Sequence, residues 1–420
     1  MPKITRIVAR EILDSRAIPT IEVALLTDSG SYSVASVPSG VSMSQNEDVE
    51  LRDGDLNRYH GKGVLKAVDH IHKTLAPALI GRDVTAQEKL DNIMLELDGT
   101  PNQSKLGANS ILAISIAAIK AAASCYNLPL FMYLQKRYRP GGNLRVPTPI
   151  FNLINGGAHG AGNLDFQEFH FIPSSRMPYK EALRAGAEIW MSLRDELIHR
   201  NAIHSVGDEG GFAPNLFTNA DALELMSLVI KNSPYRLGLD VYLGLDVAAN
   251  GFYKNGAYHI KDSPKPLDRQ GMIQLYQTLV KDYGLLGIED PLDHEDWKGW
   301  TELTRVIPES TMVIGDDLIT TNAIRLKQAI EKKACSAVIV KPNQIGTITE
   351  TIALLKVAQD NNITTISSHR SGETNDTFIA DFAVGLGTNY AKFGAPDRGE
   401  RVAKYNRLLE IDAFLNGQQQ

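Results

Sequence analysis

Hydrophobic and polar residues alternate near the start of the chain, in the segments 4–8 and 20–26. Residues 27–30, which read Thr-Asp-Ser-Gly, are typical of a turn between two such runs. The pattern therefore predicts a small antiparallel sheet over residues 3–37. Helical periodicity follows at about 62–78, 86–98 and 104–125. Strands followed by helices indicate a compact α+β unit.

All periodicity stops at residues 139–143, which read Arg-Pro-Gly-Gly-Asn. Proline and glycine at this density are typical of a break between two folded units. A chain of 420 residues also exceeds what one core usually supports. We therefore expect an N-terminal α+β domain over 1–138 and a second domain over 139–420.

From about residue 240 onward, short apolar runs each end in one polar residue. These residues are Asp246, Glu289, Asp316, Lys341, His369 and Lys392. Apolar runs without alternation predict strands that are buried on both faces, as in a parallel sheet. Their spacing, about 25 residues for most pairs, leaves room for a crossover helix. Repeated units of this kind favour a closed α/β barrel, in which all six polar residues would meet at the carboxyl-terminal mouth.

The charge balance of 43 Lys+Arg against 49 Asp+Glu, with no basic stripe, argues against direct binding of nucleic acid.

Two cysteines, Cys125 and Cys335, cannot form a disulfide framework and are interpreted as buried structural thiols. The N-terminus shows no hydrophobic signal region, and the apolar stretch 111–123 is too short to span a bilayer. We therefore expect a cytoplasmic protein without a membrane span.

Three of the polar residues at the predicted mouth are carboxylates: Asp246, Glu289 and Asp316. They would repel one another unless a cation lay between them. Oxygen ligands without nearby His or Cys indicate Mg²⁺ rather than zinc. For any one of them, a helix cap or an ion pair with arginine is the alternative.

Lys341 and Lys392 are candidates for a general base. A lysine here could serve only as an ion-pair partner, but a divalent metal and a second ammonium make its neutral form accessible. It could then remove a proton from a carbon next to a carboxylate. Glu209 lies in the glycine-rich loop 205–214 and is the candidate acid, with a simple turn as the alternative.

Further candidates would contact the substrate. His159 lies in the glycine-rich loop 154–162, and Glu168 follows it; either could instead be structural. Arg370 and Ser371 follow the predicted strand over 364–368 and could clamp a phosphate.

An ordered set of motifs resembles the enolase family over essentially the whole chain. The motifs are AREILDSR at 9–16, LRDGD at 51–55, LGAN at 106–109, GDDL at 315–318, NQIG at 343–346 and RVAKYN at 401–406. The resemblance implies an α/β protein, with an enolase-type TIM-like barrel whose second strand is antiparallel and an N-terminal α+β capping domain. It also implies a lyase of glycolysis and gluconeogenesis, a phosphopyruvate hydratase (a carbon–oxygen hydro-lyase), that dehydrates 2-phosphoglycerate reversibly to phosphoenolpyruvate. Enolase-superfamily enzymes combine a Lys or His base with Mg²⁺, so the lysine assignment is not independent of the resemblance.

By the same resemblance, two Mg²⁺ ions act per active site. Asp246, Glu289 and Asp316 would hold the first, and Ser39 would join a second that arrives with the substrate phosphate. Lys341 would be the base and Glu209 the acid. The residues that would bind the small phosphorylated acid are His159, Glu168, Arg370, Ser371 and Lys392. The family forms homodimers and, in many bacteria, octamers built from dimers.

The chain departs from the family in one loop. Enolases usually read Ser-Gly-Ala-Ser-Thr-Gly, whereas residues 39–44 read Ser-Gly-Val-Ser-Met-Ser. Ser39 is present, but Met43 and Ser44 could alter how the loop spanning 41–46 closes over the substrate. A paralogue acting on a related phospho- or phosphonate acid, such as a carboxyphosphonoenolpyruvate synthase, is therefore the alternative. A third hypothesis is an idle member that only binds, at the cell surface or in an RNA degradosome; the presence of Lys341 and Glu209 argues against this as the sole role.

Overall fold

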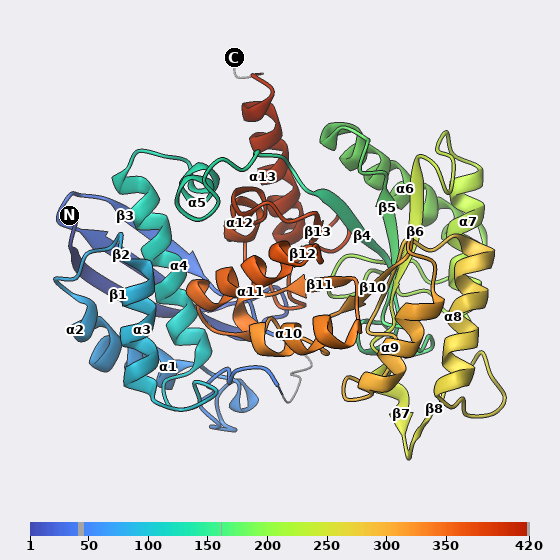
Figure 1. Ribbon diagram of the computed structural model, residues 1–420, viewed down its shortest axis with the longest axis horizontal. Coiled ribbons are helices and arrows are strands. Elements are labelled where there is room, and N and C mark those ends of the chain that lie inside the picture. Colours follow the sequence, from blue (N-terminus) through green and yellow to red (C-terminus); the bar gives the residue numbers. More distant parts are fainter. Residues whose placement is uncertain (41–45, 161, 418–420) are drawn as a thin grey trace.

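The computed structural model describes residues 1–40, 46–160 and 162–417, which form two units side by side (Figure 1). The first unit begins with the strands β1 (Ile4–Leu13), β2 (Pro19–Thr27) and β3 (Tyr32–Ser36). They form one antiparallel sheet in the order β1-β2-β3. The predicted meander over 3–37 is confirmed. The loop that departs from the family falls largely on residues 41–45, which lie outside the described residues.

Helices cover this sheet. They are α1 (Leu65–His70), α2 (Ala76–Leu79), α3 (Gln87–Asp98), α4 (Ala108–Cys125) and α5 (Leu130–Tyr138). The helix predicted over 62–78 is divided, because a π-helical turn at Ile71–Leu75 separates α1 from α2. Pro77 stands in the first turn of α2 and has no N–H, so the regular hydrogen-bond pattern cannot run through it.

Helix α4 corrects two predictions. By length and composition it could cross a membrane, so the apolar stretch is longer than expected. However, 83% of its 18-residue window is buried inside the fold, where the helix packs against β2 and β3. Cys125 is its last residue and is only half-buried, because the helix emerges from the core there. Cys335 is buried, as predicted.

The second unit is a closed eight-stranded barrel in the order β10-β11-β12-β13-β4-β5-β6-β9. Its strands are β4 (Thr148–Asn155), β5 (Glu168–Pro173), β6 (Val241–Asp246), β9 (Gly287–Glu289), β10 (Met312–Gly315), β11 (Ala337–Val340), β12 (Thr364–Ser368) and β13 (Tyr390–Lys392). Strand β5 runs antiparallel to both neighbours, and the other neighbouring pairs are parallel. The α/β class and the antiparallel second strand are as the resemblance implied.

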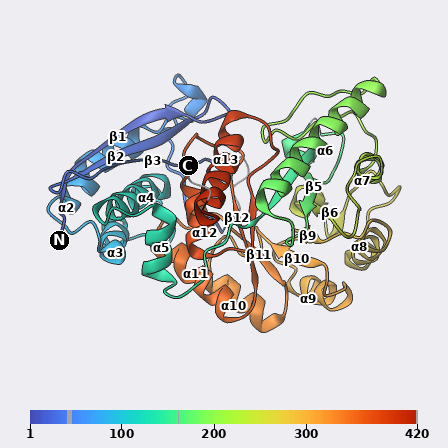
Figure 2. The same cartoon turned by 90° about the horizontal axis from the view of Figure 1, so that it is seen from above.

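Helices surround these strands (Figure 2). They are α6 (Tyr179–His199), α7 (Asn219–Lys231), α8 (Arg269–Tyr283), α9 (Trp297–Val306), α10 (Ala323–Lys332), α11 (Ile348–Asp360), α12 (Phe378–Leu386) and α13 (Gly399–Leu415). A small hairpin, β7 (Tyr253–Lys254) and β8 (Ala257–Tyr258), follows β6. Apolar side chains form a separate cluster inside the barrel: Ile150, Ile172, Ile314, Ala337, Ile339 and Ile366. This apolar cluster fills the barrel below its mouth.

The first unit contacts the barrel beside that mouth. Ser39 pairs with Gly372 through two backbone hydrogen bonds of 2.8 and 3.0 Å. The N–H of Asp48 donates to the carbonyl of Gln344 (3.0 Å). The loops that follow β11 and β12 are thus held from outside by the N-terminal unit.

Candidate active site

The six polar residues predicted at the barrel mouth lie at the ends of neighbouring strands. Asp246, Glu289 and Lys392 are the last residues of β6, β9 and β13, and Asp316, Lys341 and His369 directly follow β10, β11 and β12. All except Glu289 line one concavity of about 530 Å³, which includes space open to solvent. The geometry that the apolar runs predicted is confirmed.

Lys392 holds one side of the mouth together. Its Nζ atom lies 2.9 Å from Asp246 Oδ2, 2.8 Å from Glu289 Oε2 and 3.2 Å from Glu168 Oε2. Burial lowers the pKa of Lys392, but the three carboxylates raise it well above its usual value. Lys392 is therefore an ammonium in this arrangement, with three carboxylates around it.

Lys341 occupies the other side, in an ion pair with Asp316. Asp316 also accepts a hydrogen bond from Gln344 (3.1 Å). Burial lowers the pKa of Lys341, and the nearby Arg370 and Lys392 lower it further, but Asp316 raises it, with Glu289 adding to that effect, and the net shift is upward. A neutral Lys341 thus requires that its contact with Asp316 be released.

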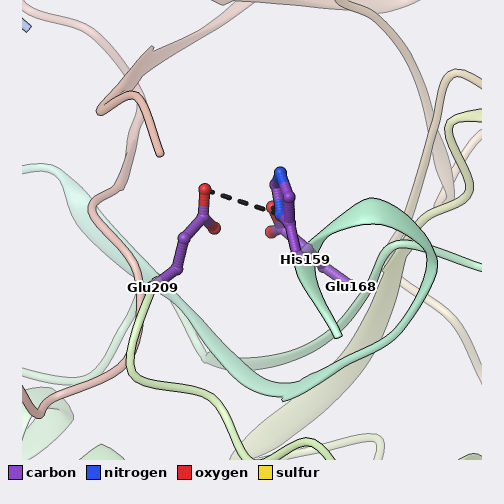
Figure 3. A group of neighbouring side chains, drawn as sticks. All are labelled: His159, Glu168 and Glu209. Carbon is purple, nitrogen blue, oxygen red and sulfur yellow. Dashed lines mark ion pairs between the residues drawn. The ribbon is translucent and has the colours of Figure 1, made fainter. Parts of the chain in front are cut away.

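Glu209 faces His159 and Glu168 across the cavity (Figure 3). The Nδ1 atom of His159 lies 3.2 Å from Glu168 Oε1 and 3.5 Å from Glu209 Oε1. Ser371 donates to Glu209 Oε1 (3.0 Å), and its hydroxyl lies 3.1 Å from His159 Nε2. Burial raises the pKa of Glu209, but His159 and His369 more than offset this and lower it to about 2. Glu209 is therefore ionised at rest.

Arg370, the predicted phosphate clamp, lies in the lining with its charge already engaged. Its Nη1 atom is 2.9 Å from Glu47 Oε2 and 3.3 Å from Asn343 Oδ1. Gly40 lies so close to the guanidinium that a Cβ atom there would overlap it. Arg370 is fixed in place but must exchange Glu47 for any anionic ligand.

Ser39 is the one predicted site residue that lies apart from the others. Its hydroxyl donates to Asp14 Oδ2 (2.6 Å) and accepts from Arg16 (3.2 Å). It is not among the residues that line the concavity. A ligand role for Ser39 would need a change in these contacts.

Several lining residues were missed from the sequence: Glu47, Gln167, Asp290 and Asp317. Asp290 and Asp317 each directly follow a predicted ligand, so the doubled acids in the sequence were an available signal. Asp290 accepts from the N–H groups of Asp316 (3.0 Å) and Asp317 (2.9 Å), and its own φ is +43°. No local pattern marks Glu47, which lies far from Arg370 in the chain.

The lining carries more carboxylates than cations. The acids are Glu47, Glu168, Glu209, Asp246, Asp290, Asp316 and Asp317, against Lys341, Arg370 and Lys392. Burial and neighbouring carboxylates raise the pKa of Glu289 and of Asp290 well above the usual range, and that of Asp317 to about 7. The Oε1 atom of Glu289 is buried without a hydrogen-bond partner among the described residues. An additional cation would relieve this charge, and oxygen donors of this kind suit Mg²⁺.

The three predicted ligands do not yet converge on one point. Among the described residues, two groups of side chains lie close enough to hold an ion: Asp290, Asp316 and Asp317, and His159 with Glu168 and Glu209. Lys392 lies between Asp246 and Glu289, and Lys341 holds Asp316. The carboxylate oxygens of Asp246, Glu289 and Asp316 are ligands that suit Mg²⁺. In this structure the ammonium groups of Lys392 and Lys341 contact these oxygens.

Two family models match the chain. One, described as "Enolase, N-terminal domain", matches residues 4–134, and the other, described as "Enolase, C-terminal TIM barrel domain", matches residues 143–420. The domain boundary predicted at 138/139 falls in the interval between the two ranges and stays a prediction.

Proposed function

The chain belongs to the enolase family, and we propose that it is a phosphopyruvate hydratase, which dehydrates 2-phosphoglycerate reversibly to phosphoenolpyruvate. The observation that carries this proposal is the separation of two proton-transfer groups in one cavity. Lys341 contacts Asp316, whereas Glu209 contacts His159 and Ser371, and the two share none of these partners. A dehydration needs this division, because one group takes the proton from carbon while another protonates the departing hydroxyl.

The metal ligands proposed are Asp246, Glu289 and Asp316, with Ser39 for a second ion that arrives with the substrate. Bound Mg²⁺ would neutralise the substrate carboxylate and the negative charge that develops as the proton leaves carbon. The excess of buried carboxylates at the mouth supports this assignment.

Lys341 is proposed to remove the proton from C2 of the substrate. Arg370 and Lys392 favour its neutral form, and Asp316 opposes it. The base must therefore be freed from Asp316 before it acts. The C2–H electron pair then forms the new double bond while the C3–O bond breaks.

Glu209 is proposed to donate a proton to the departing hydroxyl, which leaves as water. Because its carboxylate is ionised at rest, it stands ready to take a proton from water in the hydration direction. In the dehydration direction, Glu209 must carry a proton when the substrate is bound. His159, Glu168 and Lys392 would contact the substrate, and Arg370 with Ser371 would bind its phosphate, which would replace Glu47 on the guanidinium.

The direct test is an absorbance assay of phosphoenolpyruvate formation with purified protein. We expect turnover with Mg²⁺, none with EDTA, recovery when Mg²⁺ is returned in excess, and none for Lys341→Ala. No Mg²⁺-dependent turnover by the wild type would refute the proposal.

The same assay addresses the paralogue alternative, which rests on the altered loop. Met43 and Ser44 lie outside the described residues. Restoring Thr and Gly at these positions should raise activity on 2-phosphoglycerate if the chain is adapted to a different phospho- or phosphonate acid, and should change it little otherwise. The cytoplasmic location, any secondary role at the cell surface, and assembly into homodimers or octamers stay predictions.

A further inference from the structure

Arg401, near the start of α13, is fully buried and reaches two active-site loops at once. Its Nη1 atom donates to the carbonyl of Arg370 (2.6 Å), and its Nη2 atom donates to the carbonyls of Ser371 (2.6 Å) and Asp208 (3.1 Å). One guanidinium therefore joins the segment that carries Arg370 and Ser371 to the residue directly before Glu209.

The same guanidinium also faces the ring of His369. Arg401 Nη1 lies 2.7 Å from His369 Nδ1. A guanidinium has only donors and stays protonated in proteins, so Nδ1 must accept this hydrogen bond and cannot carry a proton. The ring proton must then lie on Nε2, which is 3.4 Å from Glu209 Oε2. The contacts of Arg401 thus select one tautomer of His369.

Close packing leaves these three groups little freedom. Gly394 (φ +87°) lies between them, and a Cβ atom there would stand 2.7 Å from the carbonyl oxygen of Glu209, 3.0 Å from His369 Cε1 and 3.2 Å from Arg401 Cδ. A side chain at this position would push the groups apart. The arrangement depends on glycine both for its backbone conformation and for this space.

We propose that Arg401 is a positioning residue that keeps His369 neutral, with its proton on Nε2 directed toward Glu209. This inference rests on the proposed role of Glu209 as the acid. A cationic His369 would bind the Glu209 carboxylate more strongly and make it a poorer proton donor. A neutral His369 donates one hydrogen bond that orients the carboxylate and adds no positive charge, which leaves His159 as the nearby group that lowers the pKa of Glu209.

The groups that bear on the charge of His369 act in both directions. Burial and Arg401 lower the pKa of His369, while Glu209 and Glu168 raise it. The net shift is downward, so His369 stays neutral near pH 7 in spite of two nearby carboxylates. Removing the charge of Arg401 should reverse this balance.

The test is an NMR titration of ¹⁵N-histidine-labelled protein, in which the His369 signals are assigned by their loss in His369→Gln. In the wild type we expect the Nε2–H tautomer and no titration between about pH 5 and 8. In Arg401→Met, His369 should titrate within that range. The kcat for dehydration should fall by about 100-fold, as is typical when a reacting group loses its alignment.

Arg407→Met is the matched control. Arg407 lies on the same helix and pairs with Asp381 (2.7 and 2.8 Å), and it does not line the cavity. This variant should lose stability while keeping both the wild-type kcat and the His369 tautomer.

Two results would overturn the inference: an Nδ1–H tautomer or a titrating His369 in the wild type, or an unchanged His369 in Arg401→Met. The first needs only the wild-type protein, so the test survives if Arg401→Met fails to fold. If the wild type shows the expected tautomer but does not turn over 2-phosphoglycerate, the proposed function fails and the positioning role stands.

Discussion

Replacing Lys392 with methionine removes the ammonium that joins three buried carboxylates. Lys392 is 2% exposed, and its Nζ atom lies within 3.2 Å of Asp246, Glu289 and Glu168. Methionine is unbranched and of similar length, so it fills the same space without the charge. The substitution therefore tests electrostatics more than packing.

Removing one partner of a buried ion pair costs about 3–5 kcal/mol, because the remaining charge stays buried and unpaired. Glu168 keeps its contacts with His159 and His170 (3.2 and 2.9 Å). Glu289 keeps no such support, since its Oε1 atom already lacks a hydrogen-bond partner among the described residues. Glu289 can instead take up a proton, because its pKa is already raised well above the usual range. We therefore expect the metal-free variant to lose about 3 kcal/mol of unfolding free energy, near the lower end of that range.

The measurement is urea denaturation followed by tryptophan fluorescence, in EDTA and in Mg²⁺. A ligand at 100 times its Kd stabilises the protein that binds it by about 2.7 kcal/mol. Mg²⁺ should stabilise Lys392→Met more than the wild type, because a dication replaces the missing charge. The control is Lys404→Met: Lys404 is equally buried, but its Nζ atom pairs with Glu373 (2.9 Å), away from the proposed ligands. It should lose stability and show only the wild-type response to Mg²⁺.

A Lys392→Met protein as stable as the wild type in EDTA would refute the idea that Lys392 holds these carboxylates together. If Mg²⁺ stabilises Lys392→Met no more than it stabilises Lys404→Met, the proposal that these carboxylates bind Mg²⁺ would be wrong.

Two further changes test neighbouring parts of the molecule. Burial raises the pKa of Asp48 from 3.8 to about 7, so the folded protein binds this proton more tightly than the unfolded chain, and stability should fall as the pH rises through that interval. Asp48→Asn keeps an acceptor for Gln103 (2.9 Å). The unfolding free energy of this variant minus that of the wild type should increase between about pH 4 and 7 and then level off. A difference that does not depend on pH would contradict the raised pKa of Asp48. Glu209→Gln should lower kcat by about 10²–10⁴-fold. Exchange of the C2 proton of the substrate with solvent should continue, because Lys341 removes that proton without Glu209. Loss of this exchange together with turnover, measured by ¹H NMR, would contradict separate roles for Lys341 and Glu209.

Local patterns were sufficient to predict the barrel and most of its mouth. An unbroken apolar run such as 337–340 can be stable as a strand only if both faces are buried, and parallel strands place their carboxyl ends on one rim. Asp246, Lys341 and Lys392 could thus be placed together without any long-range information. The same reasoning could not reveal that β5 is antiparallel, because the direction of a buried strand leaves no trace in its hydrophobicity.

Other errors arose where neighbours outside the segment decide the outcome. The neighbours of Cys125 in the chain are apolar, but its exposure depends on where α4 leaves the core. The ligand role of Ser39 stays a prediction, and only the fold shows that its hydroxyl contacts Asp14 and Arg16.

The sequence by itself determined which residues end the strands, because the burial of a strand is recorded in its own side chains. Only the tertiary structure decided which charges meet. Glu47 contacts Arg370, and Arg401 contacts His369 and the segment before Glu209, across long stretches of chain. Arg370 in turn lowers the pKa of Lys341, and Arg401 lowers that of His369. Electrostatic interaction depends on distance and burial in space, and neither quantity is recorded in the local order of residues.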